Sequence, residues 1–410
     1  MARSALILVE GHRGNGPLYI QAIQNFGLHP ITLSTDPAQY DYLNTENSQA
    51  ICVNTDSLAA LIHECTGLRA FYDIAGITGF TALDESLYAR VGKLCQHFDL
   101  PGPNPESIER CCDKFTQRQL LAEAGVPIPT YRLAVNAAEV QSAAAAIGLP
   151  VILKPAAGSG SSGVRLCRNV DEVAEHTTYL LGENDLWSSP RILVEEFAQG
   201  PFYSADLMGN QVVGIEAADF GPPPHFVFRG ATHPAPLTDE KYKRIADVAL
   251  SCLPALGLGW GPTNIELRWT KRGPIVIEVN PRLSGATCPK LVRLAYGVDL
   301  VTEHIKIIVG GECNLRKRHS HVAATRFLLP DRDGTLDFID GESRAAAVPG
   351  VAEVKLYVKP QTPIVRKGDY RDSIGHVIAA SPSRAQTEAI LQSAVDLIAW
   401  SITPFPLHDA

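Results

Sequence analysis

Apolar residues in the first quarter of the chain come in short runs separated by segments with helical spacing. Residues 4–35, SALILVEGHRGNGPLYIQAIQNFGLHPITLST, combine an apolar run, a glycine turn, a helical segment and a second apolar run. Residues 70–80, AFYDIAGITGF, add a further strand and turn, and a helix is expected over 81–98. Short buried strands that alternate with helices are typical of a parallel sheet. The pattern therefore predicts a Rossmann-like α/β domain over residues 1–105.

The pattern changes after residues 100–107, LPGPNPES, where prolines and a glycine mark a domain boundary. A helix is expected from Lys114 to Gly125, and the prolines that follow it begin an extended segment. Residues 202–217, FYSADLMGNQVVGIEA, predict a β-hairpin that turns at residues 209–210. Hairpins mixed with helices indicate an α+β arrangement in this part of the chain.

The C-terminal part of the chain predicts short strands and one long amphipathic helix over about 383–401. This pattern indicates a further, smaller α+β domain. We therefore expect an N-terminal domain over 1–105, a central domain over 106–320 with subdomains at 106–193 and 194–320, and a C-terminal domain over 321–410.

Charge and cysteine content exclude some classes of partner. Lys and Arg number 36 and Asp and Glu number 44, which gives a net charge of −8. The one basic run is LRKRHSH at 315–321, so a nucleic acid partner is not expected. The nine cysteines form no Cys-x-x-Cys pair, which argues against a zinc site and for a reducing compartment. The N-terminal apolar run is too short for a signal peptide or a membrane span, so we expect a cytoplasmic protein.

A glycine- and serine-rich loop follows a lysine at the end of an apolar run. The stretch ILKPAAGSGSSGV, residues 152–164, places Lys154 on a predicted strand. Such a loop is either a hairpin or linker, or a cradle whose N–H groups bind a phosphate. It is not a P-loop, because its lysine precedes the glycines and no Gly-Lys-Ser/Thr closes it. The loop residues are Gly158, Ser159, Gly160, Ser161, Ser162 and Gly163.

Two glutamates are expected to face each other in a second hairpin, residues 261–287. With a turn centred on Arg272, Glu266 lies opposite Glu278, and Asn280 shares a face with Glu278. Like charges opposite one another destabilise a sheet unless solvent or a cation neutralises them. Two carboxylates and an amide oxygen suit Mg²⁺ or Mn²⁺. The alternative is a solvated face screened by Arg268 and Arg282.

Together these motifs resemble the ATP-grasp superfamily, and within it the carboxylate-amine ligases, over about residues 110–285. The resemblance implies that Lys114 and Lys154 contact the ATP phosphates and that the glycine-rich loop closes over the β- and γ-phosphates. It implies an adenine-binding hinge at Glu195, Glu196, Phe197 and Ala198, and magnesium ligands at Glu266, Glu278 and Asn280. Arg282 would meet the transferred phosphoryl group, so Arg282 and Lys154 are the catalytic candidates. The chain departs from the family at Phe202, where an acidic residue or histidine usually faces the ribose.

The stretch FVFRGATHPAPL, residues 226–237, and the C-terminal part resemble the L-amino acid ligases, which make dipeptide antibiotics. The resemblance implies that His233 and Arg282 contact the first amino acid and that Gly285 and Ala286 border its pocket. It implies an ATP-dependent ligase with Mg²⁺ or Mn²⁺ that joins two amino acids through an acyl phosphate and releases ADP and phosphate. It also implies a homodimer.

Other classes of function remain open from the sequence. A biotin-carboxylase-like or other ATP-grasp ligase would act on a carboxylate that is not an amino acid. An ATP-grasp kinase would phosphorylate its substrate without releasing phosphate. A nucleotide-binding protein without turnover is disfavoured by the full set of charged residues. A dehydrogenase is disfavoured because Gly11, Gly14 and Gly16 are spaced G-x-x-G-x-G.

Overall fold

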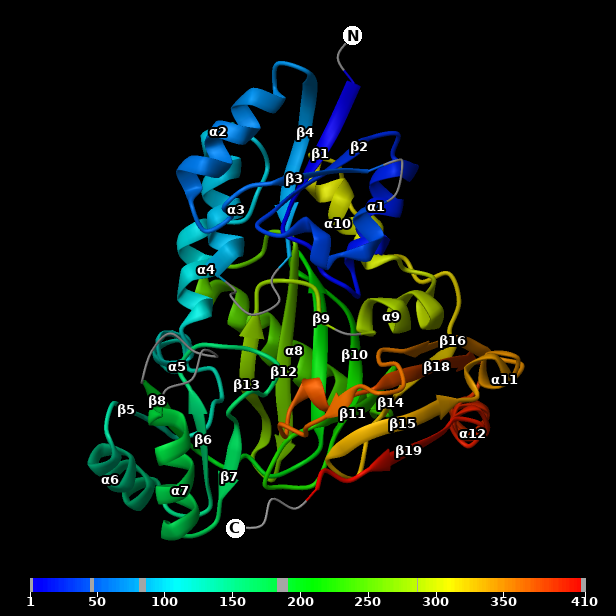
Figure 1. Ribbon diagram of the computed structural model, residues 1–410. Coiled ribbons are helices and arrows are strands. Elements are labelled where there is room, and N and C mark those ends of the chain that lie inside the picture. The colour runs from blue at the N-terminus through cyan, green and yellow to red at the C-terminus, as the bar shows by residue number, and fades with distance from the viewer. Residues whose placement is uncertain (1–2, 45–47, 81–85, 183–190, 286, 407–410) are drawn as a thin grey trace.

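The N-terminal unit is a parallel α/β sheet, as the sequence predicts. The computed structural model describes residues 3–44, 48–80, 86–182, 191–285 and 287–406. Four parallel strands lie in the order β3-β2-β1-β4, with helices on both faces (Figure 1). The elements are β1 (Arg3–Val9), α1 (Gly16–Asn25), β2 (His29–Ser34), β3 (Gln49–Cys52), α2 (Leu58–Leu68), β4 (Tyr72–Gly79) and α3 (Ser86–His97).

A small antiparallel sheet carries Lys154 and the glycine-rich loop. Its strands lie in the order β5-β8-β6-β7, with α6 and α7 packed together against it (Figure 1). Asn136 caps the start of α6, where its side-chain oxygen accepts a hydrogen bond of 3.0 Å from the Glu139 N–H. The elements are α4 (Pro105–Cys112), α5 (Lys114–Glu123), β5 (Tyr131–Ala134), α6 (Ala137–Ile147), β6 (Val151–Pro155), β7 (Arg165–Cys167), α7 (Val170–Leu181) and β8 (Ile192–Glu196).

An eight-stranded antiparallel sheet forms the centre of the molecule. Its order is β13-β12-β9-β10-β11-β14-β18-β16, so it continues across the domain boundary expected near residue 320. Its elements and the helices beside it are β9 (Phe202–Met208), β10 (Gln211–Phe220), β11 (Phe228–His233), α8 (Asp239–Leu256), β12 (Pro262–Thr270), β13 (Gly273–Asn280), α9 (Cys288–Tyr296), α10 (Leu300–Ile308), β14 (Val322–Leu328), β16 (Val351–Leu356) and β18 (Gly375–Ser381).

The long helix expected over about 383–401 is wrong in its second half. Helix α12 spans Arg384–Val395, and strand β19 follows at Ala399–Thr403. Strand β19 pairs with β15 (Gly334–Asp340), which also pairs with β17 (Pro363–Ile364). The sequence AWSIT contains an aromatic and two β-branched residues, which suit a strand once a partner edge is available. The short helix α11 (Glu342–Ala346) completes this part. Among the described residues, no helix is both long and apolar enough to cross a bilayer.

A β-bulge sets the register of the hairpin that contains the two glutamates. Glu266 pairs with Glu278, as predicted, but the loop is Lys271-Arg272 and so is not centred on Arg272. Leu267 pairs with Val276, which leaves Ile277 as the extra residue of the bulge. The extra residue shifts the pairing by one position, so Glu266 still faces Glu278 although the loop is one residue shorter than a turn centred on Arg272 requires.

Helix α5 covers the bulged edge strand. The Gln117 amide exchanges hydrogen bonds of 2.9 Å with the backbone N–H and C=O of Val279. The Arg118 guanidinium donates to the backbone C=O of Ile277, the bulged residue. These side chains supply hydrogen-bond partners that the backbone of an edge strand lacks. They therefore hold β13 in the position where the Glu278 carboxylate faces the site.

The sheet strands alternate between an apolar face and a polar face. Tyr203, Ala205 and Leu207 of β9 point into the core that α5 and α8 share with the sheet. Ser204 and Asp206 therefore point to the opposite face, and both are buried. That opposite face holds the candidate site.

The close pairing of β11 with β14 gives a test of the continuous sheet. A Cβ at Gly230 would lie 2.3 Å from the backbone oxygen of Thr325, so Gly230→Ala should force the strands apart. We expect a loss of about 1–3 kcal/mol in the free energy of unfolding, measured by urea denaturation. Gly67→Ala is the control, because a Cβ there meets nothing within 4 Å. Equal stability of the two variants would contradict the strand pairing.

Candidate active site

Polar side chains form two rows across the central sheet. In the first row, Glu278 pairs with Glu266, Glu266 with Ser204, and Ser204 with Glu216. In the second row, two residues along each strand, the aligned positions are Asn280, Asn264, Asp206 and Gly214. Residues two apart on a strand share a face, so both rows lie on one surface. The expected metal ligands Glu266, Glu278 and Asn280 are therefore brought together at the β12–β13 end.

Lys114 connects helix α5, the carboxylate pair and the glycine-rich loop. It begins helix α5, whose N-cap is Asp113, and its Nζ lies 2.8 Å from Oε1 of Glu278. The same ammonium group donates to the backbone C=O of Gly158 in the glycine-rich loop. The structure thus places the first predicted lysine between the carboxylate pair and the loop.

Lys154 lies in a buried charge cluster on β6. Its Nζ is 2.7 Å from Oε2 of Glu195, and Nε of Arg118 is 2.6 Å from Oε1 of the same carboxylate. All three side chains are at most 6% exposed. Burial lowers the pKa of Lys154, although Glu195 opposes that effect. Burial acts to raise the pKa of Glu195, but Arg118 and Lys154 outweigh it and hold the pKa below its usual value.

The predicted adenine hinge lies at the end of β8. The Glu195 side chain is committed to Lys154 and Arg118, and the Glu196 N–H donates to the Thr130 C=O. Phe197 and Ala198 directly follow the strand, and the Arg268 guanidinium lies 5.7 Å from the Phe197 ring centroid. Adenine contact at these four residues stays a prediction.

The carboxylate pair is suited to a cation. Burial raises the pKa of Glu266 above its usual range, and the Glu278 charge raises it further. Burial also acts to raise the pKa of Glu278, but Lys114, Lys154 and Arg282 together lower it. One carboxylate is therefore costly to ionise beside the other. A divalent cation held by Glu266, Glu278 and Asn280 would neutralise the pair, and an all-oxygen set is what Mg²⁺ prefers.

The glycine-rich loop is held from the C-terminal part of the chain. Gly158, Gly160, Ser161 and Gly163 all have positive φ, a conformation that glycine adopts at little cost. The Ser162 hydroxyl donates to Oδ2 of Asp369 at 3.1 Å. The Tyr370 ring packs so closely on Gly160 that a Cβ there would lie 2.4 Å from it.

The remaining predicted residues are Arg282, Gly285, Ala286 and His233. The Arg282 guanidinium donates to Oδ1 of Asn280 at 3.4 Å and to the backbone C=O of Leu283 at 3.1 Å. Gly285 is half-buried, and Ala286 lies outside the described residues. His233 is 0% exposed, with its ring edge-on to Tyr296 at 4.8 Å between centroids. A direct contact between His233 and a substrate stays a prediction.

Arg118, Asp206 and Glu216 are not among the residues predicted from the sequence. Arg118 lies four residues after Lys114 on the buried face of α5, where apolar side chains are usual. Asp206 and Glu216 interrupt the apolar strands of the predicted hairpin. Burial raises the pKa of both carboxyl groups. A charged residue at a core position was the available signal in each case.

The chain is similar to known proteins over nearly its whole length. The family described as "Carbamoyl-phosphate synthase L chain, ATP binding domain" matches residues 113–316, and the one described as "L-amino acid ligase C-terminal domain 2" matches residues 326–403. The uncharacterized protein y4rH of Sinorhizobium fredii is 60% identical over 409 residues, or 99% of this chain and 85% of that protein.

Two further similarities concern proteins with named activities. Carnosine synthase 1 of Homo sapiens is 28% identical over 326 residues, which are 73% of this chain and 39% of that protein. The crystal structure of L-amino acid ligase from Bacillus licheniformis has a TM-score of 0.83 at 19% identity, with coverage of 98% of this chain and 100% of that chain.

The fold, the two lysines before the carboxylate face and these matches define an ATP-grasp protein. Specifically, the chain belongs to the ATP-grasp ligases that resemble the L-amino acid ligases. ATP and Mg²⁺ are the cofactors of this class, and the buried pair Glu266 and Glu278 fits the ion.

The buried charge cluster gives a test of how Lys154 is positioned. Glu195→Gln removes the carboxylate that Arg118 and Lys154 share and leaves these two buried cations side by side. We expect a loss of about 3–5 kcal/mol in the free energy of unfolding at pH 7, measured by urea denaturation. Glu196→Gln is the matched control, because its partner Arg272 is 56% exposed and such pairs contribute at most about 1 kcal/mol.

The stability difference between the wild type and Glu195→Gln should depend on pH. The pKa of Glu195 is lower in the folded protein than its ordinary value of 4.5, so its stabilising effect is full above that pH. The effect is lost as the pH falls through the lower folded-state pKa. The stability difference between wild type and Glu195→Gln should therefore shrink in acid. A difference that is absent at pH 7, or no larger than that of Glu196→Gln, would contradict the role of Glu195.

Proposed function

We propose that this protein is an ATP-dependent ligase that joins two amino acids through an amide bond. The observation that carries the proposal is the paired Glu266 and Glu278, with Lys114 bridging Glu278 to the glycine-rich loop. This arrangement suits a metal-bound nucleotide whose phosphates lie between the loop and the carboxylates. The similarity to L-amino acid ligases in the C-terminal part, and to carnosine synthase over 73% of the chain, supports amino acids as the substrates.

The proposed reaction has two steps. A carboxylate oxygen of the first amino acid attacks the γ-phosphorus of ATP, the bond to the β-phosphate oxygen breaks, and ADP leaves. The amine of the second amino acid then attacks the acyl carbon, the bond to the phosphate oxygen breaks, and phosphate leaves after the amine loses a proton. The products are an amide, ADP and phosphate.

The side chains of this chain supply positioning and charge. Lys114 and Lys154 would bind phosphate oxygens and offset the charge that develops during transfer. Arg282, which is held by Asn280 and Leu283, would bind the acyl phosphate. Mg²⁺ would supply further neutralisation of the phosphate oxygens. No nucleophilic side chain is required, because the substrate carboxylate is the nucleophile.

Glu278→Gln tests the carboxylate pair. The substitution removes one predicted metal ligand and the partner of Lys114. We therefore expect Mg²⁺-dependent phosphate release to fall at least about 100-fold, which corresponds to about 2.7 kcal/mol in the barrier. Phosphate release is measured with MgATP over a matrix of amino acid pairs, with mass spectrometry of the positive pairs. Glu353→Gln is the control, because Glu353 lies on β16 at the opposite edge of the sheet.

The products of the same assay separate the proposed function from its alternatives. A dipeptide mass together with phosphate supports the ligase. A phosphorylated amino acid without free phosphate indicates a kinase, and turnover only with other carboxylates indicates a different ATP-grasp ligase. Turnover by Glu278→Gln near the wild-type rate would overturn the metal assignment. The homodimer remains a prediction from the resemblance.

A further inference from the structure

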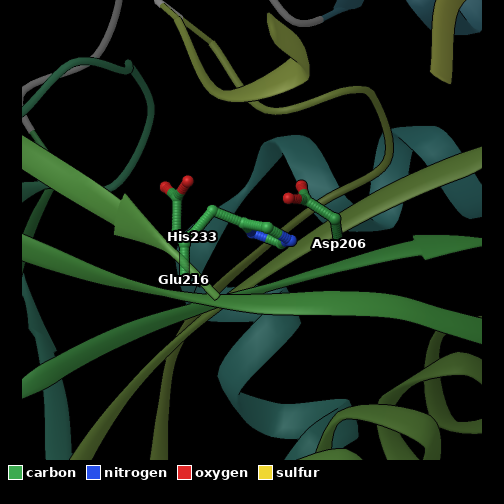
Figure 2. Close-up of side chains that lie close together, drawn as sticks. All are labelled: Asp206, Glu216 and His233. Atoms are coloured by element: carbon green, nitrogen blue, oxygen red, sulfur yellow. The ribbon is translucent and has the colours of Figure 1, made fainter. Parts of the chain in front are cut away.

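A second group of buried polar side chains lies on the same sheet face, apart from the predicted magnesium ligands. It consists of Asp206 on β9, Glu216 on β10 and His233 on β11, and we call it the Asp206–Glu216–His233 cluster. One ligand atom from each residue lies within 4.8 Å of the others (Figure 2). The three residues are 2%, 2% and 0% exposed. The group therefore combines two carboxylates and an imidazole in a space closed to solvent.

Each carboxylate uses one oxygen within the protein and leaves the other without a partner. Oδ1 of Asp206 accepts a hydrogen bond of 3.1 Å from Nδ2 of Asn264, and Oε1 of Glu216 accepts one of 3.0 Å from the Cys288 thiol. Within the described part of the chain, Oδ2 of Asp206 and Oε2 of Glu216 are buried without a hydrogen bond. Buried polar atoms without partners are costly, so these two oxygens call for a ligand.

The imidazole of His233 is likewise unpartnered and is held in place. Neither Nδ1 nor Nε2 has a hydrogen bond among the described residues. The ring lies over Gly214, where a Cβ would come within 2.4 Å of Cε1, and Tyr296 packs edge-on beside it. Figure 2 shows the ring between the two carboxylates. Packing thus fixes the His233 ring in the cluster, and the lone pair of its unprotonated nitrogen stays available to a ligand.

We propose that the Asp206–Glu216–His233 cluster binds a divalent transition-metal ion of the Zn²⁺, Mn²⁺ or Co²⁺ class. Two carboxylate oxygens and an imidazole nitrogen are a usual donor set for these ions, whereas Mg²⁺ prefers oxygen ligands alone. Two charged carboxylates would balance the charge of the ion. A bare ion also fits the burial, because an organic ammonium group would bring carbon substituents into a space where no cluster residue is more than 2% exposed.

The proposed ion would be distinct from the nucleotide-bound Mg²⁺. Glu216 pairs with Ser204, and Ser204 pairs with Glu266, so strand β9 lies between these two glutamates, and Asp206 of the cluster lies on β9 itself. The ion would neutralise the two carboxylates that stand beside the predicted magnesium ligands and would join strands β9, β10 and β11. As a metal ligand, His233 would not contact the first amino acid directly, so the proposed ion is an alternative to that predicted contact, whereas the ligase reaction itself does not depend on it.

Cobalt binding tests the proposal on the full chain without nucleotide or amino acids. The protein is freed of metal with a chelator, and Co²⁺ is added in the presence of excess Mg²⁺ to occupy the Glu266–Glu278 pair. We expect one equivalent of Co²⁺ to bind and to give visible d–d absorption. Asp206→Asn and Glu216→Gln keep the side-chain shape and should each weaken Co²⁺ binding by about 100-fold or more, since even outer-shell changes cost 10–100-fold.

Matched variants make the result decisive. Glu278→Gln should bind Co²⁺ as the wild type does, because its carboxylate belongs to the other set. Circular dichroism and thermal unfolding check that each variant is folded, and the wild-type titration stands even if one variant is not. Absence of tight Co²⁺ binding by the wild type would overturn the proposal. Equal Co²⁺ binding by wild type, Asp206→Asn and Glu216→Gln would also overturn it, as would loss of amino acid binding in these variants with Co²⁺ binding unchanged.

Discussion

Repulsion between buried carboxylates on one face of the central sheet limits how the surrounding elements can be arranged. Glu278, Glu266 and Glu216 lie in one row across four strands, and Asp206 lies in the adjacent row. Strand pairing fixes these positions, so the charges cannot separate without breaking the sheet. These charges are offset by protonation, which the raised pKa values of Glu266, Glu216 and Asp206 favour, or by cations on this face. Lys114 supplies one of them, and the proposed metal ions would supply the others.

The need to offset these charges explains how distant segments meet. Helix α5 brings Lys114 to the carboxylate pair, and its Gln117 and Arg118 side chains hold the bulged edge strand. Arg118 also shares Glu195 with Lys154, which connects the small sheet to the central sheet. Asp369, from the C-terminal part, holds the glycine-rich loop through Ser162. The predicted nucleotide site thus depends on contacts among α5, the small sheet, the central sheet and the C-terminal part.

Local pattern was enough to predict much of the fold and part of the site. The parallel N-terminal sheet follows from short apolar runs, and the opposition of Glu266 and Glu278 follows from the period of two in a hairpin. The turn itself was misplaced by half a residue, and the bulge at Ile277 compensated for it. A bulge is set by the neighbouring helix as well as by the strand, so the sequence of the hairpin alone does not specify it.

The rest depends on pairing between distant strands. Asp206 and Glu216 meet His233 only because β9, β10 and β11 adopt one register, and Arg118 finds Glu195 across 77 positions of sequence. The helix expected to reach residue 401 ends at Val395 because β15 offers an edge on which residues 399–403 pair. Tertiary partners, which local periodicity does not reveal, decided these cases.

The proposed function rests on the activation of a substrate carboxylate by phosphoryl transfer from ATP. The most direct measurement follows ¹⁸O from the carboxylate of the first amino acid into the products, for a pair that supports turnover. If the carboxylate is phosphorylated, each released phosphate carries one ¹⁸O atom and the amide keeps the other. Released phosphate without ¹⁸O would show that the carboxylate oxygen never bonds to phosphorus, which would contradict an acyl phosphate intermediate.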